Sequence, residues 1–266
     1  MAVKKRILTI TDCTDVAANE LHATLVATLD KLNANDVCIE PVVKVEQFSI
    51  LHGSFCSRLL ADSYTPEGLT ILAIVNPLDA AHSKRARIAG RLTNGIQFVG
   101  ANTGIFSWLI KDFGLDEIVE TDSTGLNGDK FVPFGGKYIH APIAAKLAAN
   151  ANLNTIKAKV FKKSDLVQIH YQQGAVLHID NFGVAKIYFK ANEFDGNNGD
   201  QYLVYLDNRK IGQATFCYSM KELRDGTLAI YPGSSLELLE LGTVRQTDTA
   251  EKLGLKIGNV VSFRRV

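Results

Sequence analysis

The stretch Leu69-Thr70-Ile71-Leu72-Ala73-Ile74-Val75 decides the fold of the first half of this 266-residue chain. It is apolar along its whole length apart from Thr70, so it lacks the alternation of a strand with one wet face. A continuous apolar run is typical of a strand buried on both faces in a parallel sheet. The preceding Thr65-Pro66-Glu67-Gly68 reads as a turn. We therefore expect an α/β fold built around this buried strand.

Strand-like and helix-like segments alternate on both sides of this run. The helical segment 17–32 carries Leu21, Leu25 and Leu29 at a spacing of four residues, which places them on one face of a helix. Asn94-Gly95 is a hairpin signal between two strand-like runs. Such alternation favours an α/β unit with a mostly parallel sheet. The expected strands are 6–10, 37–43, 69–75, 87–92 and 97–100, and the expected helices are 17–32, 50–61, 104–113 and 141–151.

Beyond Lys159 the pattern changes to many short strand-like runs separated by turns such as Asp225-Gly226. The clear helical piece there is 249–253, ended by Gly254. Many short strands at regular spacing predict an all-β barrel-like domain. We therefore predict two domains, an α/β domain over 1–160 and a β-barrel domain over 161–266. The expected strands are 167–171, 174–179, 184–189, 201–206, 211–218, 227–231, 236–241 and 260–264.

Composition narrows the classes of partner. Lys plus Arg total 29 against 28 for Asp plus Glu, a net charge of +1, so we expect no nucleic-acid partner. No apolar run reaches about 18 residues and no secretory signal precedes the first strand, so we expect no membrane partner and a cytoplasmic location. The four cysteines lack CxxC spacing, which indicates free thiols and gives a metal site no support.

Two acidic residues, Asp12 and Asp180, each lie at or just beyond a short apolar run with strand character. A carboxylate in such a place can accept two hydrogen bonds from a vicinal diol or pair with an ammonium group. Because the two lie in different predicted domains, they suggest a polar small molecule held between domains. An aspartate that satisfies turn amides is the structural alternative at both positions.

Six segments in the same order resemble the S-adenosyl-methionine-dependent hydroxide adenosyltransferase, chlorinase and fluorinase family. The family's Phe-Val-Gly-Pro-Asp-Asn-Gly is similar to 98–104, and its Ile-Asp-x-Phe-Gly-Asn is similar to 179–184, which reads Ile-Asp-Asn-Phe-Gly-Val. Its Thr-Asp-Phe-Gly is similar to 11–14. The remaining similar segments are 75–80 with the basic residues beyond it, 134–142 and 254–261.

The resemblance implies an α/β domain, a C-terminal β-barrel and a homotrimer whose sites combine the first domain of one subunit with the second of its neighbour. It implies S-adenosyl-L-methionine as substrate or ligand, a nucleoside-type small molecule without a metal, and displacement at the ribose C5′ carbon. Alignment and desolvation of the nucleophile are then the protein's main tasks. The residues that it places at the ligand are Asp12 on the ribose diol, Asp180 on the methionine ammonium, Phe182 beside the ligand, Asn102 in the ligand loop and Ser235, with Ser234, near adenine.

The sequence departs from the family pattern where water would be activated. Hydroxide-transferring members use an Asp, an Arg and a His, and the matching positions here are Asn76, Arg85 and Gly135. Lys84 takes the place of Arg85 if the gap is moved. An amide takes no proton at neutral pH and glycine has no side chain, and loss of a general base costs about 10²- to 10⁴-fold in rate. Replacements weighed against surface or structural roles are His82, His140 and Asp79.

Two classes of function stay open at this stage. The retained Asp12, Asp180, Phe182 and Arg85 favour an S-adenosyl-L-methionine hydrolase giving adenosine and methionine, with Asn76 and Arg85 at the catalytic positions. The lost water-activating groups favour a catalytically silent trimer that binds a nucleoside or S-adenosyl-methionine.

Overall fold

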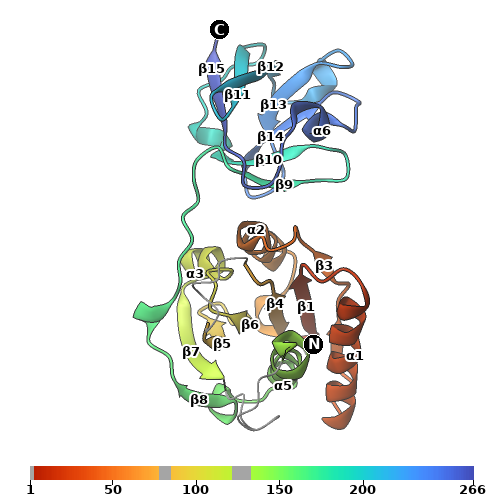
Figure 1. The fold of residues 1–266 in the computed structure, drawn as a ribbon, viewed down its shortest axis with the longest axis vertical. Helices are drawn as coiled ribbons and strands as arrows, with labels where there is room; N and C mark the ends of the chain where they lie inside the picture. The colour runs from red at the N-terminus through yellow and green to blue at the C-terminus, as the bar shows by residue number, and fades with distance from the viewer. Residues whose placement is uncertain (1–2, 78–84, 122–132) are drawn as a thin grey trace. The chain divides into compact units, whose positions relative to one another are not determined.

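The computed structural model describes residues 3–77, 85–121 and 133–266 and divides into two compact units (Figure 1). The first unit is Met1–Ile169 and the second is His170–Val266. The segment 161–169 belongs to the first unit because it packs there: Phe161 is buried, and Ser107 Oγ accepts a hydrogen bond from the Ile169 amide at 3.2 Å.

The first unit contains one mixed sheet with helices against it. Its strands follow the order β2-β1-β4-β6-β5-β7-β8, with β3 also paired to β1. Every residue of β4 is buried, as the apolar run predicts. The strands are β1 (Lys5–Thr11), β2 (Val37–Ile39), β3 (Val43–Lys44), β4 (Leu69–Ile74), β5 (Arg87–Leu92), β6 (Gln97–Ala101), β7 (Leu115–Thr121) and β8 (Lys157–Val160).

The expectation of a mostly parallel sheet is only partly confirmed. Strand β1 pairs in parallel with β2, β3 and β4, and β4 pairs in parallel with β6. The Asn94-Gly95 turn, where Gly95 has a φ of 97°, reverses the chain and makes β5 antiparallel to β6. Strands β7 and β8, which the sequence pattern did not predict, then continue antiparallel.

Two pairs of helices cover the two faces of this sheet. Leu21, Leu25 and Leu29 of α1 are buried in one cluster with residues of α5. On the other face, Gly53 of α2 lies against Val75. The side chain of Val75 points opposite to that of Ile74, because side chains alternate along a strand. The helices are α1 (Val16–Lys31), α2 (Ile50–Ala61), α3 (Ser107–Phe113) and α5 (Ala141–Ala148), the last preceded by a π-helical turn, Gly136–His140.

The second unit is a curled, mostly antiparallel sheet in the order β15-β11-β12-β13-β14-β10-β9, with β12 and β13 parallel (Figure 1). A bridge between Ala175 and Val260 links its two edges, which accounts for the barrel-like character expected from the sequence. The expected strand over 167–171 is absent, because the backbone of its first residues bonds to Asn102 and Ser107 side chains instead. The elements are β9 (Val176–Ile179), β10 (Ala185–Lys190), β11 (Gln201–Leu206), β12 (Arg209–Phe216), β13 (Leu228–Pro232), β14 (Leu238–Thr243), α6 (Thr249–Leu253) and β15 (Val261–Arg265).

Candidate functional site

The carboxyl ends of the parallel strands bring several predicted residues to one edge of the first unit's sheet. Asp12 follows β1 and Asn76 follows β4, and the register pairs Thr11 with Ile74. The chain leaves β1 toward β2 on one side and returns to β4 on the other. In open α/β sheets such a switch point, at the carboxyl ends of the strands, is where ligands bind. This edge is therefore the candidate site of the first unit.

Asp12 keeps part of its hydrogen-bonding capacity at this edge. Its Oδ2 accepts a hydrogen bond from the Phe48 amide at 2.9 Å. Its Oδ1 accepts none from any residue that the structure describes. Asp12 therefore anchors the loop before α2 and still offers one carboxylate oxygen to a ligand.

The predicted catalytic positions flank a segment outside the described residues. Asn76 is exposed beyond β4, and Arg85 is half-buried just before β5. His82, Asp79 and Lys84 lie outside the described residues, so their proposed roles stay predictions.

Asn102 uses both ends of its side chain to hold the chain that leads to the second unit. It is buried, its Nδ2 donates to the Asp165 carbonyl at 2.9 Å, and its Oδ1 accepts from the Val167 amide at 3.0 Å. In this arrangement its amide serves the backbone, and its predicted contact with a ligand stays a prediction.

Arg87, Gly135 and His140 form a cluster at the same edge. Arg87 begins β5 opposite Ala101, so it lies beside the carboxyl end of β6. A Cβ atom built on Gly135 lies 3.8 Å from Arg87 Nε. His140 is buried, and the Arg87 charge acts on its imidazole. The sequence pattern gave no signal for Arg87 at this site, because the approach of its guanidinium to Gly135 and His140 follows from packing between distant segments.

Acid should destabilise the first unit through His140. Burial, and secondly the Arg87 guanidinium, lower the pKa of His140 from 6.5 to about 4. Between these values the unfolded chain binds a proton that the folded chain does not, so the stability present above pH 6.5 is lost as pH falls toward 4. At about 1.4 kcal/mol for each pKa unit, the loss is roughly 3 kcal/mol.

Denaturant unfolding at pH 7 and pH 4.5 measures this dependence. His140→Asn removes the titration, so the acid-induced loss should shrink by about 2 kcal/mol or more. His22→Asn, on the exposed face of α1, is the matched control and should keep the wild-type loss. Equal losses in the His140 variant and the wild type would contradict the assignment.

In the second unit, Asp180 organises the turn between β9 and β10. Its Oδ1 accepts hydrogen bonds from the amides of Phe182 at 2.9 Å and Val184 at 3.0 Å. Gly183, with a φ of 70°, completes the turn. Oδ2 accepts no hydrogen bond within the described part of the chain, and Phe182 is 58% exposed. Asp180 therefore does satisfy turn amides, as the structural alternative expected, and its Oδ2 stays available beside the exposed ring of Phe182.

A row of polar side chains crosses four neighbouring strands next to this turn. The register pairs His178 with Lys186, Lys186 with Glu240, and Glu240 with Tyr231. Burial and the Glu240 carboxylate raise the pKa of Tyr231, and burial and the Lys186 ammonium lower the pKa of His178. Both groups are therefore neutral near pH 7, and the Asp180 charge acts on both. Sequence reasoning missed this row, since only the register reveals it.

Ser235 is buried in the turn between β13 and β14, where its carbonyl accepts from the Leu238 amide. Leu238 pairs with Lys190 at the end of β10, whereas Asp180 precedes the start of β10. The sheet therefore holds Asp180 and Ser235 at opposite ends of one strand.

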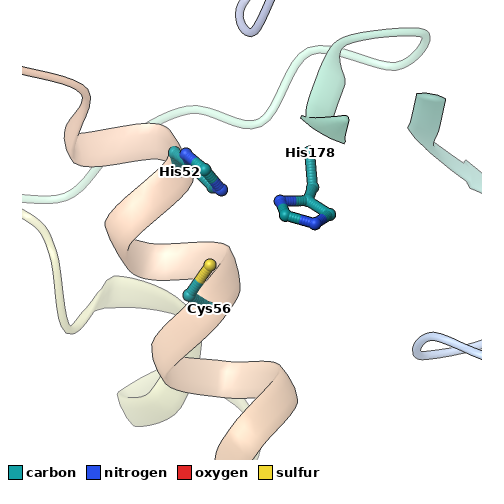
Figure 2. Close-up of side chains that lie close together, drawn as sticks. All are labelled: His52, Cys56 and His178. Carbon is teal, nitrogen blue, oxygen red and sulfur yellow. The ribbon is translucent and has the colours of Figure 1, made fainter. Parts of the chain in front are cut away.

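Figure 2 shows His52 and Cys56 one turn apart on α2; His178, also labelled there, belongs to β9 of the second unit. His52 Nδ1 accepts a hydrogen bond from the Glu46 amide at 2.9 Å. Burial raises the pKa of the Cys56 thiol to about 12, so it stays protonated at neutral pH. On α2 this pair therefore behaves as a capping imidazole and a buried thiol.

The fold is that of a two-unit protein, with an α/β unit and a curled β unit, and the candidate site of the first unit lies at the carboxyl ends of its parallel strands. The profile of the SAM hydroxide adenosyltransferase N-terminal domain matches residues 7–157, and the chain belongs to this family. It is 24% identical over 259 residues to the (R)-S-adenosyl-L-methionine hydrolase of Methanocaldococcus jannaschii, covering 93% of this chain and 91% of that protein.

Two solved structures share the fold. An uncharacterized conserved protein from Thermotoga maritima aligns with a TM-score of 0.81 and 20% identity, covering 97% of this chain and all of that one. A conserved hypothetical protein from Thermus thermophilus aligns with a TM-score of 0.73 and 19% identity, covering 98% of this chain and all of that one. Among the helices described, none has the length and apolarity needed to cross a bilayer.

Proposed function

We propose that this protein hydrolyses S-adenosyl-L-methionine to adenosine and methionine. The oxygen of water bonds to the ribose C5′ carbon, the C5′–S bond breaks with its electron pair going to sulfur, and a proton leaves to solvent. The sulfonium departs as a neutral thioether, so positioning and desolvation of water are the main requirements. Family membership and the name of the archaeal relative support this proposal.

The observation that carries the proposal is the available oxygen of Asp12 at the switch point of the sheet. We propose that it accepts the ribose hydroxyls, and that Asp180 pairs with the methionine ammonium beside Phe182. Arg85 and Asn76 flank the reacting carbon, and Ser235 lies near the adenine, at the opposite end of β10 from Asp180. Following the family resemblance, we propose a homotrimer whose sites combine the first unit of one subunit with the second unit of its neighbour.

Incubation of the purified protein with S-adenosyl-L-methionine tests the reaction. Chromatography should show adenosine and methionine forming in equal amounts and in proportion to protein concentration, above a buffer blank. Light scattering on the same preparation should give the mass of three chains. Absence of turnover above the blank would sink the hydrolase proposal.

A silent binding protein is the second candidate, because Asn76 and Gly135 replace two water-activating groups. Calorimetry distinguishes the two. S-adenosyl-L-methionine binding without product favours the silent trimer, and absence of both adenosine and S-adenosyl-L-methionine binding removes both candidates.

A further inference from the structure

The position where a side chain of Gly135 would lie is open and borders the Arg87 guanidinium. A Cβ atom added there meets Arg87 Nε at 3.8 Å and Nη2 at 4.0 Å, and no other heavy atom of the described residues lies within 4 Å of it. At the next residue, Gly136, the same atom would stand 2.9 Å from the Ile74 side chain. The backbone at Gly135 is α-helical, with a φ of −57° and a ψ of −30°, so its lack of a side chain is not required by the turn. A small group therefore fits beside the Arg87 guanidinium.

His140 is a buried imidazole that lacks hydrogen-bond partners. Its side chain belongs to a residue that is 7% exposed, and neither Nδ1 nor Nε2 has a partner among the described residues. Buried polar groups are paired in most native structures, and an exception calls for an explanation such as an ordered water, an ion or a catalytic role. His140 thus has one donor and one acceptor available for a small polar molecule.

The charge of the cluster favours a neutral imidazole beside an available guanidinium. No carboxylate within the described ranges forms an ion pair with Arg87, and the Arg87 charge is the one that acts on His140. Burial and this charge keep the pKa of His140 low, at about 4, so the imidazole carries a lone pair throughout the neutral range. Asn76, which follows β4 two strands away in the sheet, cannot take a proton at neutral pH.

We propose that Arg87 and His140 hold the attacking water in the open space beside Gly135, with His140 as the residue that accepts its proton. This inference rests on the proposed hydrolase function. Arg87 donates an N–H to the water oxygen, and a ring nitrogen of His140 accepts a water hydrogen. The oxygen bonds to C5′ as the C5′–S electron pair leaves with methionine, and the proton passes to His140 and then to solvent.

A weak base is sufficient for this step. Attack by neutral water on a sulfonium-activated carbon produces a protonated alcohol, which is a far stronger acid than an imidazolium. His140 therefore needs only to be unprotonated and within reach, and it is unprotonated at neutral pH. Arg87 and His140 thus take over the role of the water-activating groups that are missing at Asn76 and Gly135.

His140→Asn tests the base directly in the full-length protein. Its kcat should fall by about 10²- to 10⁴-fold, with the KM for S-adenosyl-L-methionine within threefold of the wild type. His22→Asn, exposed on α1, should keep the wild-type kcat. Thermal melts and calorimetric binding establish that the His140 variant folds and still binds the substrate.

Gly135 variants test the water position without removing a polar group. Gly135→Ala fits the open space and should keep substantial turnover, whereas Gly135→Leu fills it and should lower kcat at least tenfold while substrate binding and melting temperature persist. An active wild type with normal kcat in His140→Asn or in Gly135→Leu would overturn this inference and leave the hydrolase proposal intact. A wild type without turnover would overturn both.

Discussion

Replacing Glu240 by leucine is expected to lower the free energy of unfolding of the second unit by about 3–5 kcal/mol. Lys186 Nζ lies 2.5 Å from Glu240 Oε1, and the two side chains are 11% and 9% exposed. Removing the carboxylate leaves an ammonium group buried without its counter-charge, and Tyr231 loses its hydrogen-bond acceptor. Chemical denaturation of the full chain, followed by fluorescence and circular dichroism, measures the change.

The double variant Lys186→Met, Glu240→Leu isolates the unpaired charge as the cause. Replacing both partners by apolar groups of similar size is often neutral, so the double variant should recover most of the lost stability. Lys252→Met breaks the exposed pair with Asp248, whose side chains are 58% and 42% exposed. It should change stability by about 0.5 kcal/mol or less. A single Glu240 variant as stable as this control would refute the account.

Asp180→Asn is expected to weaken S-adenosyl-L-methionine binding by about 100-fold, measured as a calorimetric Kd. The asparagine Oδ1 can still accept from the amides of Phe182 and Val184, so the turn should persist. The variant removes only the charge proposed to pair with the ligand's ammonium group. Truncating one partner of a hydrogen-bonded charge pair typically costs about 2–5 kcal/mol, and each 1.4 kcal/mol is about tenfold.

Asp195→Asn is the matched control for charge in the same unit. Its side chain is 95% exposed, and it follows the end of β10 whereas the turn precedes the start of that strand, so binding should stay within threefold of the wild type. Equal Kd values for Asp180→Asn and the wild type, with an unchanged melting temperature, would show that Asp180 serves only the turn.

Local signals in the sequence predicted most helices and strands. The helix over 50–61 has the bounds of α2, because Ser49 caps its first turn and apolar residues continue to Ala61. The apolar run 69–75 predicted β4, because a strand that is buried on both faces is apolar at nearly every position. The Asn94-Gly95 hairpin is equally local, since Gly95 supplies the positive φ of the turn.

The rest depends on contacts between distant segments. Strand β7 begins directly after α3 and shows a mixed polar pattern, so it emerges only by pairing with β5. The approach of Gly135 and His140 to Arg87, and the polar row from His178 to Tyr231, follow from packing and register that no short window of sequence contains. Motif matching located Asp12 and Asp180 but could not show which of their oxygens the backbone already uses.

The Asn102 side chain makes two hydrogen bonds, to the backbone of Asp165 and of Val167, and this affects how motif similarity should be interpreted. A side chain fastened at both ends by architecture would be retained in descendants that had abandoned the ancestral reaction. A match to the family at such a position indicates a shared fold, and it is weak evidence for a shared reaction. Residues whose polar atoms stay open, such as Asp12, are the more informative markers of shared activity.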